Sequence, residues 1–226
     1  MVAGPPALVT VAHGTRNPVG NRVAVELTAA VGERLGVPAT ASYVELCAPL
    51  LTTALERLAG PAVVVPLLLS TGYHLRTDLP AAVAAATTDV ALGGPLGPDP
   101  LLAAAQVDRL LAAGAERGQP VAMVAAGSSD PDALVELDAA ARLLAEQWGA
   151  PVRLATLAGL GPRPEQVLRP GDAVSPYLLA EGHFADRART AARDAGATTV
   201  ACVIGAHARV VDLVCRRFAG LAAAAA

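Results

Sequence analysis

Apolar and polar positions along the chain fall into two alternating kinds of segment. Short continuous apolar runs are typical of strands buried on both faces of a parallel sheet, and longer segments with apolar residues at helical spacing indicate amphipathic helices. The pattern predicts strands over 7–12, 39–46, 63–69, 90–92 and 121–126, and helices over 20–35, 49–58, 79–86, 101–116 and 132–148. This alternation predicts right-handed βαβ units and a mainly parallel sheet.

The second half of the chain repeats the first. Three blocks match in the same order: LVTVAHGTRNP (8–18) with VAMVAAGSSDP (121–131), PLLLSTGYH (66–74) with PYLLAEGHF (176–184), and LGPDPLLAAAQ (96–106) with IGAHARVVDLV (204–214). Internal repeats of this length mark duplicated structural units. The sequence therefore predicts an α/β fold of two similar lobes, residues 1–117 and 118–226, each a mainly parallel sheet flanked by helices.

Composition narrows the class of protein. Hydrophobic residues make up 54% of the 226 residues and charged residues 16%, which favours a compact fold, and the net charge of −3 gives no electrostatic argument for nucleic acid or an anionic membrane. The three cysteines form no CxxC pair and indicate neither a disulfide framework nor structural zinc. There is no apolar run of membrane-spanning length and no basic signal-peptide region before the first strand. We expect a soluble, reduced, cytoplasmic protein.

Reactive side chains gather at the ends of three predicted strands. His13 follows the first strand, Glu45 ends the second and His74 comes shortly after the third. The carboxyl ends of parallel strands share one edge of the sheet, which is where ligands bind in open α/β folds. Because imidazole suits divalent transition metals, we expect the two histidines to share a metal ion, with Glu45 within reach of the same space.

The duplication serves as an internal control on this interpretation. Residues needed for folding should occur in both halves, as the glycines after the first strand of each half do (Gly14 and Gly127). The reactive side chains do not persist, since the positions opposite them hold Ala126, Ala158 and Phe184. The first lobe is therefore predicted to carry the metal site, and the second to lack it.

Two further histidines receive other interpretations. His207 matches Asp99 at a helix start, which favours a surface or capping residue. His183 falls beside Tyr73 in the ungapped match, whereas a slip of one residue would set it against His74. Its role stays open.

The motifs AHGTRNP (12–18) and P-L-L-L-x-x-G-x-H-x-x-x-D-x-P (66–80), with a glutamate ending the second strand, resemble the sirohydrochlorin chelatases. These form the CbiX/SirB group of class II chelatases, and the resemblance to the two-lobed form covers nearly the whole chain. It implies a bilobal chelatase-like fold and a lyase that inserts Co2+ or Fe2+ into sirohydrochlorin, for cobalamin or siroheme biosynthesis. The metal is then a substrate, and no organic cofactor is expected.

The resemblance also implies roles for individual residues. His13 and His74 would hold the incoming metal, with Glu45 as a further catalytic residue beside them and the tetrapyrrole in the cleft between the lobes. Sirohydrochlorin carries many carboxylates, which arginines near the ligands would orient. The predicted substrate-binding residues are Arg16, Arg76, Ser70, Thr71 and Tyr73.

Two other classes of function compete with the chelatase. One is a non-catalytic metal- or tetrapyrrole-binding carrier with the same fold. The other is an enzyme of different chemistry on a flavodoxin-like scaffold, because fold alone does not fix function. The intact set of two histidines and one glutamate favours the chelatase over the carrier, and we expect a monomer or a homodimer.

Overall fold

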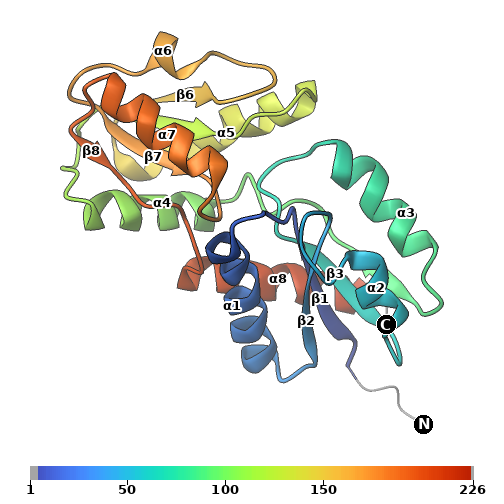
Figure 1. Cartoon of the computed structure of the whole chain (residues 1–226). Coiled ribbons are helices and arrows are strands. Elements are labelled where there is room, and N and C mark those ends of the chain that lie inside the picture. The colour runs from blue at the N-terminus through green and yellow to red at the C-terminus, as the bar shows by residue number, and fades with distance from the viewer. Residues whose placement is uncertain (1–4, 225–226) are drawn as a thin grey trace. The chain divides into compact units, whose positions relative to one another are not determined.

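The computed structural model describes residues 5–224, and within this range the chain forms two four-stranded parallel sheets (Figure 1). The first sheet has the order β2-β1-β3-β4, built from β1 (Ala7–Ala12), β2 (Ala39–Tyr43), β3 (Ala62–Pro66) and β4 (Val90–Leu92). The second has the order β6-β5-β7-β8, built from β5 (Val121–Ala125), β6 (Val152–Thr156), β7 (Ala173–Tyr177) and β8 (Thr199–Val200). The predicted α/β fold with two similar parallel sheets is confirmed.

Helices connect the strands. They are α1 (Pro18–Leu35), α2 (Leu51–Glu56), α3 (Leu79–Ala84), α4 (Pro100–Ala112), α5 (Pro131–Trp148), α6 (Pro164–Val167), α7 (His183–Asp194) and α8 (Ala208–Ala224), with one π-helical turn, η1 (His74–Asp78). Capping residues define where the helices begin and end. Asn17 caps α1 by accepting the Val19 N–H, and α1 ends at Gly36 with φ +66°. In the second half, Asp130 and Gly149 do the same for α5.

The continuous apolar runs correspond to central strands buried on both faces. Every residue of β3, β5 and β7 is buried, which explains why these strands show no apolar–polar alternation. In the first sheet, Val9, Val11 and Val64 pack with Leu51 and Leu55 of α2. The core therefore lies along β1 and β3, and it leaves their carboxyl ends free to carry polar residues.

The two halves also pair their strands in equivalent registers. The matching Cα pairs are Leu8↔Ala39 with Val121↔Val152, and Val11↔Pro66 with Val124↔Pro176. This agrees with the ungapped match of the sequence blocks. A slip of one residue, which would set His183 against His74, is incompatible with the pairing of the two prolines.

The compact units differ from the predicted ranges 1–117 and 118–226. The first unit comprises the chain up to Leu68, then 73–96 and the residues from Val210 onward, and the second comprises 69–72 and 97–209. Thus α4, from the first repeat, packs in the second unit, where Gln106 donates to Ser175 at 2.8 Å. Most of α8, from the second repeat, packs in the first unit.

Specific contacts fix α8 in the first unit. Asp212 pairs with Arg34 of α1, and the Arg217 guanidinium donates to the Leu96 carbonyl at 3.3 Å. The boundary near residue 118 therefore marks the repeat in the sequence and not the division in space. A repeat shows which blocks are alike, but it does not show which sheet the last helix of each block covers.

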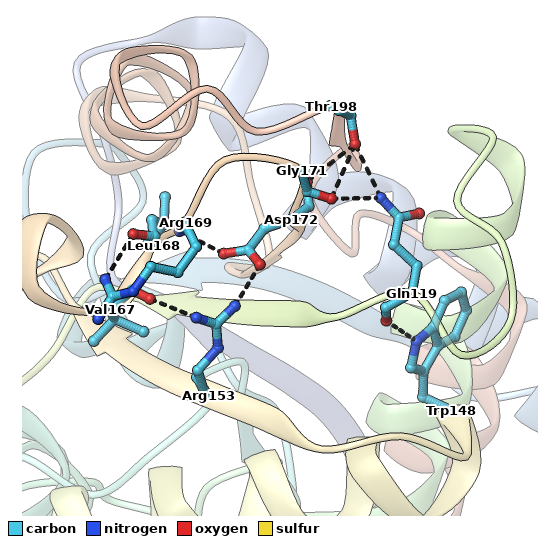
Figure 2. Close-up of polar contacts among 9 residues, drawn as sticks. All are labelled: Gln119, Trp148, Arg153, Val167, Leu168, Arg169, Gly171, Asp172 and Thr198. Atoms are coloured by element: carbon cyan, nitrogen blue, oxygen red, sulfur yellow. Dashed lines mark hydrogen bonds and ion pairs between the residues drawn. The ribbon is translucent and has the colours of Figure 1, made fainter.

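A polar network closes the loops before β7 in the second unit (Figure 2). The carboxylate of Asp172, a residue only 2% exposed, pairs with Arg153 and accepts the Arg169 backbone N–H at 2.7 Å. Nearby, the Gln119 amide donates to the Thr198 hydroxyl at 3.0 Å. The buried Asp172 carboxylate thus has partners on both oxygens, as buried polar groups require, and the network has a structural role.

Within residues 5–224, none of the helices combines the length and the hydropathy needed to cross a bilayer.

Candidate metal centre

The site begins at the turn after β1. Gly14 directly follows His13 and has φ +92°, and a Cβ atom there would lie 1.9 Å from the Glu45 carbonyl oxygen. Only glycine fits such a close approach of two backbones. The second half repeats the constraint at Gly127, which has φ +86° and where a Cβ atom would lie 2.0 Å from the Ala158 carbonyl oxygen. The glycine is therefore a backbone requirement shared by both halves.

This close approach brings His13 and Glu45 together. The Glu45 N–H donates to the His13 carbonyl at 3.1 Å, so the pairing of β1 with β2 continues beyond the strand ends. The His13 Nδ1 atom lies 3.8 Å from Glu45 Oε1, and both side chains are about half exposed, at 52% and 50%. Both groups are accessible from solvent.

His74 reaches the same place from a different element. It is the first residue of η1, whose turn closes when the Leu79 N–H donates to the His74 carbonyl. The imidazole is 28% exposed and meets the His13 ring edge to face, with centroids 4.8 Å apart and an interplanar angle of 88°. Single π-helical turns occur frequently at functional sites.

Asp78, at the other end of η1, holds the His74 ring. Its Oδ2 atom lies 2.6 Å from His74 Nδ1. Because a carboxylate accepts, Nδ1 carries the proton and Nε2 is left as the nitrogen able to bind a metal. The sequence motif over 66–80 includes Asp78, but sequence reasoning assigned this residue no individual role. The signal that identifies it is the spacing of four residues from His74, together with Ala188 at its counterpart position.

Together these elements form one candidate metal-binding cluster. The ligand atoms of His13, Glu45 and His74 all lie within 4.8 Å of one another. Two imidazoles and one carboxylate suit divalent transition metals, and three protein ligands leave coordination positions open for a substrate. The structure thus brings together the three residues predicted at the strand ends.

The second half shows no such group among the described residues. Phe184 occupies the position of His74 and is 37% exposed. His183 lies beside it at the start of α7, with the two rings 5.6 Å apart. His207 accepts the Arg209 backbone N–H at 3.2 Å through Nδ1, which is the predicted capping role.

The predicted substrate-binding residues lie in two different environments. Arg16, Arg76 and Tyr73 are exposed in the first unit, and the Tyr73 ring lies 6.1 Å from that of His74. Ser70 and Thr71 belong to a short segment of the second unit. Thr71 donates its backbone N–H and its hydroxyl to the Glu136 carboxylate at 2.5 and 2.6 Å, so this side chain is engaged within the protein.

The turn after Glu45 has an unusual backbone. The Cys47 N–H donates to the Glu45 carbonyl at 2.8 Å across Leu46, which has φ +62°. This is a γ-turn with a left-handed central residue, a conformation that costs ~1–3 kcal/mol for a non-glycine residue. Among the described residues, Leu46 is the one non-glycine residue with positive φ, and it is 50% exposed.

The fold and the cluster define a class: duplicated α/β proteins with candidate metal ligands at the carboxyl edge of one parallel sheet. The CbiX family model matches residues 7–113 and 120–221, and the chain therefore belongs to the CbiX family.

Solved structures share this fold. SirB from Bacillus subtilis with Fe3+ is 24% identical, with a TM-score of 0.85 over 98% of this chain and 97% of that one. The sirohydrochlorin chelatase SirB from Bacillus subtilis subspecies spizizenii in complex with cobalt is 24% identical, with a TM-score of 0.80 over 97% and 96%. CbiX, described as the terminal enzyme for siroheme biosynthesis in denitrifying bacteria, is 19% identical, with a TM-score of 0.70 over 95% and 98%. No curated protein matches the sequence.

Removing the Asp78 carboxylate should weaken metal binding without unfolding the protein. Losing the partner of a metal-binding histidine typically lowers metal affinity ~10–100-fold, because the ring loses its orientation and tautomer. We expect this loss of Co2+ affinity in Asp78→Ala by calorimetric titration, and a smaller loss in Asp78→Asn, whose amide oxygen still accepts. Thr77→Ala, on the same turn, is the matched control. Wild-type affinity in Asp78→Ala would contradict the role given to Asp78.

The His207 cap should make stability depend on pH. Burial, with smaller contributions from Arg109 and Arg209, lowers the pKa of His207 below its ordinary value, although Asp108 opposes the shift. The neutral ring is thus favoured in the folded state, and stability is lost as pH falls from the unfolded pKa, about 6.5, through the folded one.

The variant His207→Asn keeps a capping side chain that does not titrate in this range. We expect the unfolding free energy of the wild type to fall more than that of His207→Asn between about pH 7.5 and about pH 5.5, measured by urea denaturation. Equal pH dependence in the two proteins would show that the His207 titration does not affect stability.

Proposed function

We propose that this protein is a chelatase that inserts Co2+ or Fe2+ into sirohydrochlorin. The observation that carries the proposal is the His13–Glu45–His74 cluster at the carboxyl edge of the first sheet. Membership of the CbiX family supports it, as do the names of the structural neighbours, which include a sirohydrochlorin chelatase in complex with cobalt and SirB with Fe3+. The metal ion is a substrate in this reaction.

The cluster suits a metal ion that must be transferred from the protein to the macrocycle. Imidazole nitrogens bind ions of this group at distances near the ~2.0–2.1 Å of Zn–N bonds, and only two neutral imidazoles and one carboxylate are offered here. The remaining positions are open to the pyrrole nitrogens of the macrocycle. The exposure of His13 and Glu45, 52% and 50%, gives both substrates access. A closed four-ligand site would hold the metal and hinder its release.

Metallation also requires proton transfer. The macrocycle loses two pyrrole N–H protons as the divalent ion enters, so charge balances without a redox step and without an organic cofactor. Glu45 is the first acceptor in this proposal, because its carboxylate is exposed and lies 3.8 Å from His13 Nδ1. His13 accepts a proton once the metal leaves its ring.

The rim of the site recognises the charged edge of the substrate. Arg16 and Arg76 are both exposed and lie within three residues of a proposed metal ligand along the chain. Guanidinium groups bind carboxylates in a bidentate manner, which orients the macrocycle as well as attracting it. Tyr73 offers its exposed ring next to His74.

The test is an anaerobic absorbance assay with sirohydrochlorin and either Co2+ or Fe2+. His13→Ala and His74→Ala should abolish metal insertion, because each removes a metal ligand. Glu45→Gln should lower the rate by roughly 100-fold or more, because it removes the proton acceptor but keeps the shape. Circular dichroism should show the native fold in all three variants.

The matched control is His207 of the second half. His207→Asn should insert metal at near the wild-type rate. An inactive His207→Asn beside a fully active His74→Ala would show that the reaction had been assigned to the wrong half. Tight binding of both metal and tetrapyrrole by the wild type, without insertion, would instead identify a carrier.

A further inference from the structure

Leu46 occupies a backbone conformation that a leucine does not favour. It is the central residue of the γ-turn closed by the Cys47 N–H and the Glu45 carbonyl, with φ +62°. In left-handed conformations the Cβ atom of an L-residue crowds a backbone oxygen, which is why glycine usually takes such positions. A leucine here requires a reason beyond the turn itself.

The second half has a glycine at the equivalent position. The counterpart of Leu46 is Gly159, with φ +64°. The equivalence rests on matching hydrogen bonds just before the turn: Val44 N–H to Ala12 O and Glu45 N–H to His13 O in the first half, Leu157 N–H to Ala125 O and Ala158 N–H to Ala126 O in the second. Both halves thus place a left-handed residue at this point, and the second half uses glycine.

The surroundings differ in a way that permits the leucine. At Gly159 a Cβ atom would lie 2.1 Å from the Ser128 carbonyl oxygen, so a side chain is excluded there on steric grounds as well. In the first half the side chain is accommodated and Leu46 remains 50% exposed. The described core around β1 and β3 does not include it. Core packing therefore does not explain why a leucine is present.

The position of Leu46 supplies the reason. It directly follows Glu45, one of the three residues of the candidate metal-binding cluster, just as exposed Tyr73 directly precedes His74. Each of these two cluster residues thus has a large exposed apolar neighbour. A tetrapyrrole carries its carboxylates on the rim and presents broad apolar faces, and such faces are recognised by apolar and aromatic side chains around a few polar groups.

We infer that Leu46 is a substrate-binding residue that packs against the apolar face of the tetrapyrrole while the metal is delivered from the adjacent cluster. This inference rests on the proposed chelatase function. The γ-turn fixes the direction of the Leu46 Cα–Cβ bond relative to Glu45, so that the contact and the metal ligands are presented together. The strained conformation is retained because glycine would remove the contact.

The test compares Leu46→Gly with the wild type in three measurements. Glycine relieves the backbone strain of the turn, so the urea concentration at the unfolding midpoint should stay the same or rise. Metal-free sirohydrochlorin should bind roughly tenfold more weakly in an absorbance titration, because binding no longer buries an apolar leucine side chain. Co2+ affinity should stay within about twofold of the wild type, since the three cluster residues are intact.

Two further variants separate the possible causes. Leu46→Asn, whose residue type tolerates the left-handed conformation, should lose tetrapyrrole affinity in the same way while staying folded. Val25→Ala, the control, removes an apolar side chain of similar exposure, 52%, from α1 and should bind the tetrapyrrole like the wild type.

Wild-type tetrapyrrole affinity in Leu46→Gly would overturn the inference and leave the proposed function standing. A lowered unfolding midpoint in both Leu46→Gly and Leu46→Asn would also overturn it, by showing that the side chain is structural. A wild-type protein that does not bind sirohydrochlorin would overturn the proposed function itself, and the inference with it.

Discussion

The backbones that follow β1 and β2 approach each other so closely that no side chain fits between them, and the proposed metal centre depends on this contact. A Cβ atom at Gly14 would lie 1.9 Å from the Glu45 carbonyl oxygen, and the Glu45 N–H bonds to the His13 carbonyl at 3.1 Å. Any larger residue at position 14 would separate the two strand ends. The backbone contact therefore holds the main chains of His13 and Glu45 next to each other, and their side chains start from neighbouring positions.

The duplication separates the backbone arrangement, which both halves share, from the reactive side chains, which they do not share. The second half keeps the same close approach at Gly127 and a left-handed residue, Gly159, at the position of Leu46, yet it carries alanines at the positions of His13 and Glu45. The backbone arrangement is thus a property of the fold. The reactive side chains, the π-helical turn that presents His74 and the leucine at position 46 occur in the first half, where the cluster lies.

Much of this arrangement follows from the sequence, for physical reasons. Strands such as β3 and β5 are buried on both faces, so they appear as continuous apolar runs. Within each sheet, the parallel topology brings the carboxyl ends of the strands to one edge. That reasoning was sufficient to place His13, Glu45 and His74 together. The matched blocks of the two halves also prove equivalent in strand register, as Val11↔Pro66 and Val124↔Pro176 show.

Other features depend on contacts that a linear pattern does not encode. The placement of α4 and α8 follows from long-range packing, such as Gln106 with Ser175. The hydrogen bond of Asp78 to His74 depends on a π-helical turn, which has no strong sequence signal. The engagement of Thr71 by Glu136 joins residues far apart in the chain, so a side chain predicted to bind substrate was found bonded within the protein.

The proposed chemistry depends on His13 and His74 binding the same ion, which X-ray absorption spectroscopy of the Co2+-loaded protein can measure. Shared binding predicts two imidazole nitrogens per cobalt, at distances close to the ~2.0–2.1 Å of Zn–N bonds. Each of His13→Ala and His74→Ala should reduce the imidazole contribution to one. A cobalt spectrum without imidazole scattering, or one that neither substitution changes, would show that the two histidines do not share the ion.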